Sequence, residues 1–247
     1  MSKFSYKKTA KDIGWNFENL KMTKEVPSNY NYYKDCVSHI NNKTVMLDIG
    51  CGSCDKSIKY FYQAKKVIGL DNEQEMLNKA QANLNKLFGK NTLNNFEFVV
   101  GDCNNLSFDA NSFDLIVSRH CGANMQQVHQ ILKKGGVFIS EDVDNDDCFE
   151  LKQIFNRGQN YQSSYDHKKE TIICCAKMFS KIELLNFEEI EYYETIEDLE
   201  FLLKNTPIIN GYDKEKDYKT LLSYVEKNTV GKGIKLIRRL YSFKMTK

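Results

Sequence analysis

The sequence predicts an α/β fold, in which a doubly wound, Rossmann-like and mostly parallel sheet has helices on both of its faces. Short apolar runs that end in glycine or aspartate alternate with segments whose apolar residues recur at helical spacing. The connections between these segments are short, as in chains of successive strand–helix–strand units. The chain has 247 residues and two prolines, so we expect one large domain with additions and no proline-rich linker.

Five apolar runs have the length and composition of buried strands, and we expect them to form the core of the sheet. They are residues 44–50, 66–71, 96–102, 112–119 and 136–143. Between the second and third runs, Met76, Leu77, Ala80, Leu84 and Leu87 follow a period of about 3.6 residues, which predicts a helix that ends at Gly89.

The segments on either side of this core predict additions to it. Residues 1–43 are polar with scattered aromatic side chains, and we expect an N-terminal helical cap there. Residues 44–247 are then one domain, with its core in 44–143 and substrate-side helices and a hairpin in 144–247. In the last part we expect helices at 169–185, 196–205 and 213–227 and strands at 187–195 and 233–247. The two strands add an antiparallel hairpin, which makes a sheet of about seven strands.

Composition excludes several classes of protein. Hydrophobic residues make up 41% and charged residues 28%, as in ordinary globular proteins. The net charge of +2 gives no general attraction to nucleic acid, although it leaves a local basic patch open. No apolar run reaches the roughly 20 residues that cross a membrane, and the N-terminus is too polar for a secretory signal. Eight cysteines fit reduced thiols, so we expect a cytoplasmic protein.

The stretch MLDIGCGSCDKS, residues 46–57, holds two glycines, two cysteines and two acids. A metal or redox site here would use Cys51 and Cys54. Structural zinc normally needs four ligands, usually from two such pairs, and the chain has no second Cys-x-x-Cys. The context of a thioredoxin motif is also missing. We therefore expect no metal and interpret the stretch as a glycine loop that binds a cofactor.

Polar side chains stand at the carboxyl ends of four expected strands, where ligands bind in doubly wound sheets. They are Asp48, Asp71, Asp102 and Ser118. Gly50 and Gly52, with Asp71 about 20 residues further on, partly match a dinucleotide fingerprint. The third glycine is absent, however, and Asp48 would repel a pyrophosphate. Three carboxylates instead favour a cationic cofactor without phosphate, such as S-adenosylmethionine.

The chain resembles the class I S-adenosylmethionine-dependent methyltransferase superfamily, and within it an uncharacterised bacterial group of the small-molecule type. The resemblance covers about residues 44–143. It is carried by the combination of LDIGCGSC, GLDNEQEML, GDCNNLSF, FDLIVSRH and ILKKGGVFIS. It implies S-adenosyl-L-methionine as the cofactor and methyl transfer as the reaction.

The resemblance also implies which residues bind the cofactor. Asp48 and the backbone of residues 50–52 would hold its methionine end, and Asp71 would accept hydrogen bonds from both ribose hydroxyls. The remaining contacts would be to the adenine and to the floor near the methyl group. The implied set is Asp48, Gly50, Cys51, Gly52, Asp71, Asn72, Met76, Asp102, Cys103 and Ser118.

The candidate catalytic residues lie at the end of the fourth expected strand, with Arg119 as its last residue and His120 directly after it. Methyl transfer depends mainly on alignment, and a base is needed only when the acceptor holds a proton that it does not lose easily. His120 is our candidate for a base or substrate contact; alternatively, it caps a helix or bonds to the backbone. Arg119 would bind a substrate carboxylate or pair with a local acid. Aromatic residues of the cap, among them Tyr32 and Tyr33, would form a lid or an ordinary covering layer.

The function that we expect is methyl transfer to an unidentified, small-molecule acceptor. One alternative is an RNA or protein methyltransferase of the same fold, since basic residues without acids follow Lys227. A second is a non-catalytic module that binds S-adenosylmethionine, and a third is a nucleotide-dependent oxidoreductase. We expect no membrane partner, and the sequence carries no signal for an oligomeric state.

Overall fold

A computed structural model of the chain describes residues 4–15, 17, 19–89 and 94–247. The chain divides into two compact units. Unit 1 comprises Met1–Tyr30, Val143–His167 and Asn186–Leu240, and unit 2 comprises Asn31–Asp142, Lys168–Leu185 and Tyr241–Lys247. The predicted boundary after residue 43 stays a prediction.

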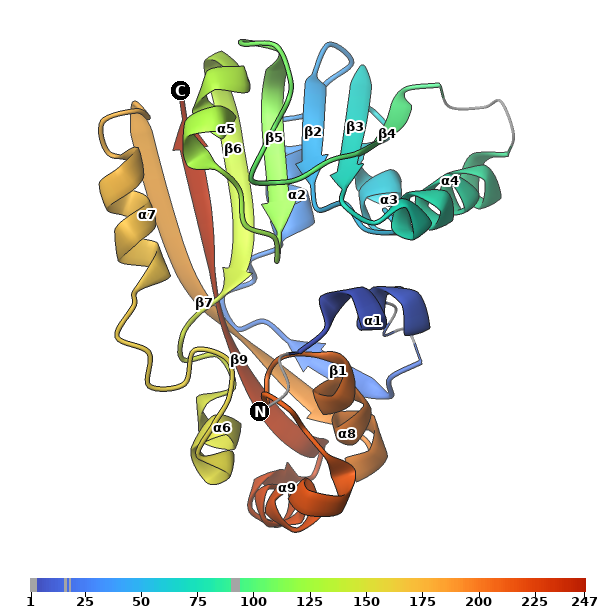
Figure 1. The fold of residues 1–247 in the computed structure, drawn as a ribbon, viewed down its shortest axis with the longest axis vertical. Coiled ribbons are helices and arrows are strands. Elements are labelled where there is room, and N and C mark those ends of the chain that lie inside the picture. Colours follow the sequence, from blue (N-terminus) through green and yellow to red (C-terminus); the bar gives the residue numbers. More distant parts are fainter. Residues whose placement is uncertain (1–3, 16, 18, 90–93) are drawn as a thin grey trace. The chain divides into compact units, whose positions relative to one another are not determined.

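Unit 2 contains the parallel part of the sheet. Its strands are β2 (Val45–Ile49), β3 (Lys66–Asp71), β4 (Phe96–Val100), β5 (Phe113–Arg119) and β6 (Leu132–Val143), the last of which ends at the unit boundary. They lie in the order β6-β5-β2-β3-β4, and each neighbouring pair is parallel. The arrowheads of β2, β3, β5 and β6 accordingly point the same way in Figure 1. All the carboxyl ends therefore meet at one edge of the sheet, as expected.

Helices cover both faces of this sheet. Those of unit 2 are α2 (Tyr32–Val37), α3 (Ser57–Phe61), α4 (Gln74–Phe88), α5 (Met125–Ile131) and most of α7 (His167–Cys175). On β4, Val99 packs against a cluster that includes residues of α5, whereas Phe98 packs against a cluster of α3 and α4. Since adjacent strand residues point to opposite faces, the two clusters lie on opposite sides of the sheet.

Unit 1 contains α1 (Tyr6–Asp12), β1 (Met22–Glu25), α6 (Phe149–Phe155), α8 (Ile196–Asn205), α9 (Lys214–Asn228) and β8 (Thr229–Val230). Two long strands, β7 (Lys181–Tyr193) and β9 (Gly233–Thr246), belong partly to each unit. The core of unit 1 is apolar and centres on Leu151, Leu199, Leu221 and Leu236.

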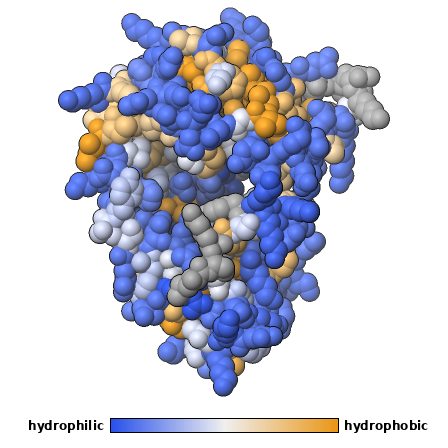
Figure 2. Space-filling model, viewed as in Figure 1, coloured by the Kyte–Doolittle hydropathy of each residue, from blue (hydrophilic) through white to orange (hydrophobic). Residues whose placement is uncertain are grey.

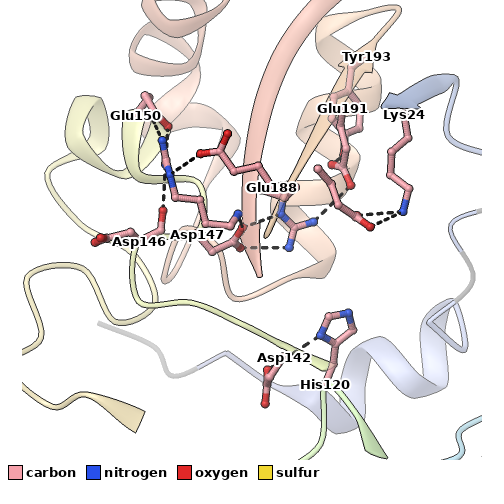
Figure 3. A network of polar contacts seen from close by, with 12 residues as sticks. Lys24, His120, Asp142, Asp146, Asp147, Glu150, Glu188, Glu191 and Tyr193 are labelled. Carbon is pink, nitrogen blue, oxygen red and sulfur yellow. Dashed lines mark hydrogen bonds and ion pairs between the residues drawn. The ribbon is translucent and has the colours of Figure 1, made fainter. Parts of the chain in front are cut away.

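Buried charges in unit 1 are paired with one another (Figure 3). The guanidinium of Arg238 donates two hydrogen bonds to Asp147, at 2.9 and 3.1 Å, and lies 3.5 Å from Glu191. The hydroxyl of Tyr193 donates to the same Glu191 at 2.5 Å. A buried carboxylate is costly without such partners, and this network supplies them where β7, β9 and the segment before α6 meet.

The predicted fold class is confirmed, with differences at the ends of the chain. The described residues form a sheet of nine strands rather than about seven. The N-terminal segment includes β1, which pairs antiparallel with β7, as well as helices. The helix predicted at 169–185 is wrong beyond Cys175, since β7 begins at Lys181. There, alternating residues such as Ile182 and Leu184 pack against the core of unit 2, as they do in a strand.

Hydrophilic residues cover most of the face shown in Figure 2, with smaller groups of hydrophobic ones. Among the described residues, no helix combines the length and the hydrophobicity that a membrane span requires.

Candidate active site

The register of the parallel strands brings the expected site residues together at one edge of unit 2. Ile49, the last residue of β2, lies opposite Leu70 of β3 and Ser118 of β5. The next residue, Gly50, donates its N–H to the carbonyl of Leu70 at 2.8 Å. The glycine loop, residues 50–54, therefore starts directly beside Asp71.

Two neighbouring side chains pack against the glycine loop. Gly50 has a φ of +69°, and a Cβ there would lie 2.6 Å from both Cβ and Sγ of Cys121. Glycine adopts this backbone conformation without strain, and the close approach of Cys121 leaves no room for a Cβ. Gly52 also has a positive φ, and a Cβ there would be 3.5 Å from Cε of the buried Met76, an ordinary contact. Met76 thus lies against the loop, where the sequence places one face of the adenine site.

Asp71 is held by backbone N–H groups. Its Oδ2 accepts from Gly52 at 2.9 Å and its Oδ1 accepts from Glu73 at 3.0 Å. A carboxylate has about four acceptor positions, so two remain for the hydroxyl groups of a ligand. The N–H groups of Gly50 and Cys51 donate to Leu70. The N–H groups of residues 50–52 are thus all engaged within the protein, where they fix this part of the loop and Asp71.

Asp48 is buried, with 5% of its surface exposed, and its Oδ2 accepts a 2.6 Å hydrogen bond from the hydroxyl of Ser57. Burial raises the pKa of Asp48 from 3.8 to about 7, because the charged form loses its hydration; the bond from Ser57 acts in the opposite direction, and Asp71 adds to the rise. A cation bound beside Asp48 would favour its ionised form.

The segment after β4 supplies more exposed groups. Asp102 is exposed, and its Oδ1 accepts from the backbone N–H and the side-chain amide of Asn104, at 2.8 and 3.1 Å. Cys103 is half-buried, and its thiol interacts with that of Cys121. Asn72, which follows β3, is exposed. Asn72, Asp102 and Cys103, which the sequence assigns to the cofactor site, are therefore all present at this edge of the sheet.

The polar residues at the end of β5 make internal contacts. The buried Ser118 donates its hydroxyl to the carbonyl of Cys121 at 2.5 Å and closes the turn after the strand. Arg119 lies opposite Glu141 of β6 and donates from Nε to its carboxylate at 2.7 Å. Burial disfavours the charged guanidinium, but Glu141 outweighs this effect, so the pKa of Arg119 is raised and it stays a cation. Arg119 therefore has the local acid that was one of its two expected partners.

His120 is more exposed than the buried Ser118, with 39% of its side-chain surface accessible to solvent. It has a φ of +54°, and its backbone N–H donates to the carbonyl of Glu141 at 2.9 Å. Its Nδ1 lies 4.0 Å from Oδ1 of Asp142. Figure 3 shows the two side chains facing each other. The 4.0 Å distance is too long for a hydrogen bond, and the two side chains form an ion pair only when the imidazole carries a second proton. The imidazole is thus placed at the edge of the sheet with an acid near one nitrogen.

Helix α2 brings two tyrosines to the same unit. The ring of Tyr33 stacks on that of Tyr60 in α3, with 4.8 Å between centroids, and the guanidinium of Arg119 lies 5.8 Å from it. Tyr32 is buried and meets Tyr33 edge to face, at 5.2 Å. Trp15 and Phe17, two further aromatic residues of the expected N-terminal cap that we considered for the lid, belong to unit 1.

A family model for the methyltransferase domain matches residues 40–223. The chain belongs to this methyltransferase family. The match covers the glycine loop and the carboxyl ends of β2 to β6, where the candidate site lies. The resemblance to methyltransferases is therefore confirmed.

The curated relatives are methyltransferases by name. Over 98 residues, 39% of this chain and 50% of the relative, the chain is 31% identical to a probable cobalt-precorrin-6B C(15)-methyltransferase of Methanococcus maripaludis. Over 119 residues, 44% of this chain and 43% of the relative, it is 25% identical to an uncharacterized methyltransferase of Schizosaccharomyces pombe. The chain spans about half the length of the curated relatives it matches.

Solved structures share the fold. The YcgJ protein of Bacillus subtilis superposes with a TM-score of 0.59 at 18% identity, covering 87% of this chain and 95% of that one. Phosphoethanolamine N-methyltransferase 2 of Haemonchus contortus, solved with S-adenosyl-L-methionine, has a TM-score of 0.53 at 17% identity and covers 99% of this chain and 60% of that one. These likenesses extend the family's fold over most of the chain.

Sequence reasoning missed the residues that support the candidate site. Ser57, which bonds Asp48, is an unremarked serine at the start of α3. Glu141 and Asp142 lie in a run that was expected to be a strand, and pairing the ends of the fourth and fifth strands would have placed Glu141 opposite Arg119. No group of histidines, cysteines and carboxylates in the described ranges is arranged to hold a metal ion.

Proposed function

We propose that this protein transfers the methyl group of S-adenosylmethionine to a small-molecule acceptor. The observation that carries the proposal is Asp71: it ends β3 beside the glycine loop, its orientation is fixed by two backbone N–H groups, and two acceptor positions remain on its carboxylate. That arrangement suits a vicinal diol, such as the two hydroxyls of a ribose.

The other residues of the edge suit the remainder of the cofactor. Asp48 is a buried carboxylate that a bound ammonium group would stabilise in its ionised form. Asp102 offers an exposed carboxylate to an adenine amino group, and Met76 offers an apolar surface beside the loop. When bound, S-adenosylmethionine supplies a methyl group activated for displacement by its sulfonium. The protein's contribution is to hold and align the reactants.

On the acceptor side, we propose that His120 removes a proton where the acceptor carries one. Nδ1 lies 4.0 Å from Oδ1 of Asp142, so we assign the role of proton acceptor to Nε2 of the neutral imidazole. Arg119 supports this end by its ion pair with Glu141, whose backbone carbonyl also holds the N–H of His120.

A small acceptor is favoured over nucleic acid by the charges of the C-terminal segment. Several of the basic residues that follow Lys227, which suggested a surface for nucleic acid, form ion pairs with acidic side chains. Arg238 pairs with Asp147, Arg239 with Glu150 and Lys244 with Asp35. One curated relative, the probable cobalt-precorrin-6B methyltransferase, is named for a small-molecule substrate, and one neighbouring structure contains phosphomonomethylethanolamine with S-adenosylhomocysteine. We also propose a cytoplasmic location, which the eight free cysteines support.

The test is transfer of a labelled methyl group. The purified protein is incubated with S-adenosylmethionine, labelled in its methyl group, and a small-molecule fraction of cell extract, and the labelled product is identified by mass spectrometry. Asp71→Ala is the matched control. We expect a product with the wild type that Asp71→Ala reduces. Binding of the cofactor without any labelled product would favour the non-catalytic module. Label in RNA, with retention that weakens steeply as salt rises, would favour the RNA enzyme.

A further inference from the structure

Tyr32 has a buried hydroxyl group that the rest of the described chain does not satisfy. The residue is 4% exposed, and its hydroxyl oxygen makes no hydrogen bond to any of the described residues. The thiol of Cys36, one helical turn further along α2, lies beside it, but a thiol is only a weak hydrogen-bond partner. Buried polar groups are almost always paired, so an orphaned hydroxyl at the candidate site requires an explanation.

The surroundings of this hydroxyl are acidic. Burial raises the pKa of Tyr32, and the carboxylates of Asp48 and Glu141 raise it further, which places both acids within electrostatic reach of the hydroxyl. Glu141 is already paired with Arg119 at 2.7 Å, whereas Asp48 is bonded to the neutral Ser57. A ligand group that binds between Asp48 and the hydroxyl of Tyr32 therefore has to interact favourably with a carboxylate. A cationic N–H donor can bond both to Asp48 and to the oxygen of Tyr32.

The packing of α2 fixes Tyr32 in this position. Its neighbour Tyr33 stacks on Tyr60 and also contacts Phe61, both on α3. Helix α3 begins with Ser57, the residue that bonds Asp48. Tyr32 meets the ring of Tyr33 edge to face, so α3 packs against its neighbour and also supplies the serine that bonds Asp48; all of these residues lie in unit 2.

We infer that the hydroxyl of Tyr32 accepts a hydrogen bond from the ammonium group of the methyl donor, at the methionine end held by Asp48. This assigns a further cofactor-binding residue from the segment before the sheet, and it rests on the proposed function. The hydroxyl of Tyr32 would add a neutral hydrogen-bond acceptor for the ammonium group, beside the charged carboxylate of Asp48.

The experiment measures binding of three ligands to wild type and to Tyr32→Phe by calorimetry. S-adenosylhomocysteine carries the ammonium and the carboxylate, decarboxylated S-adenosylmethionine keeps only the ammonium, and methylthioadenosine lacks both. We expect Tyr32→Phe to weaken binding of the first two by about tenfold or more, since hydrogen bonds to charged groups are among the stronger ones. Methylthioadenosine should bind both proteins equally. Tyr60→Phe, which removes a hydroxyl from the partly exposed neighbouring ring, should bind all three as wild type does.

The melting temperature without ligand gives a second reading. Removal of an unpaired buried hydroxyl should leave the melting temperature unchanged or raise it, whereas a hydroxyl with a structural role would lower it. Equal loss for all three ligands, or no loss for S-adenosylhomocysteine, would overturn the assignment of Tyr32. Failure of the wild type to bind any of the three would instead contradict the proposed function, so the two failures are distinguishable.

Discussion

Asp48→Asn should stabilise the ligand-free protein and do so more strongly as the pH rises. The pKa of Asp48 is about 7 in the folded protein, against 3.8 without burial. Below pH 3.8 the group is protonated in both states and costs nothing. As the pH rises towards 7, only the unfolded state releases the proton, so stability is lost. With 1.36 kcal/mol for each tenfold change in proton affinity, the loss is about 2 kcal/mol at pH 5 and about 4 kcal/mol at pH 8.

The asparagine removes this loss, because it cannot ionise and still accepts the hydrogen bond from Ser57. The gain should be measured by urea unfolding at pH 5, 6, 7 and 8. The single tryptophan, Trp15, lies in unit 1, so circular dichroism and hydrogen exchange of the β2 amides should be used instead of its fluorescence. The same variant should bind S-adenosylmethionine less well, because it lacks the carboxylate for the ammonium. A variant less stable than wild type at pH 8, or a difference independent of pH, would show that ionisation of Asp48 does not destabilise the folded protein.

Three further changes test other parts of the site. Asp71→Ala should weaken binding of S-adenosylhomocysteine by about 1–3 kcal/mol in calorimetry, because it removes the partner of two hydroxyls; unchanged affinity would count against the ribose assignment. His120→Ala should lower turnover more than cofactor affinity once a substrate is known, with His167→Ala as a control, and full turnover would show that His120 is not the base. Gly50→Ala should destabilise unit 2 by about 2–4 kcal/mol through backbone strain and the clash with Cys121, and Cys121→Gly should recover part of this loss in thermal unfolding.

The core of the fold could be predicted because its signals are local. Each strand from β2 to β6 is an apolar run with a polar or glycine end, and α4 shows a clear helical period. The elements outside this core were harder to predict. Strand β1, Met22–Glu25, is short and mostly exposed, and only its pairing with β7 makes it a strand. Residues after Cys175 have helix-forming composition, but their burial on the sheet decides their structure.

The candidate site likewise has one part that the sequence predicts and one part that it does not. The carboxylates at the strand ends follow from the topology, since parallel register places Asp48, Asp71 and the end of β5 side by side. The partners of these groups depend on side-chain packing that sequence spacing does not encode. The pairing of Arg119 with Glu141 required the β5–β6 register, and the unpaired hydroxyl of Tyr32 required knowledge of its burial.

We propose that the carboxyl edge of β2, β3 and β4 binds a cationic nucleoside donor. Hydrogen exchange with and without saturating S-adenosylhomocysteine tests it most directly, because it locates the ligand on the chain. We predict slower exchange in peptides that cover residues 49–55, 71–77 and 101–105, and little change in α8 and α9. Saturable binding with protection elsewhere, or no binding at all, would contradict the claim.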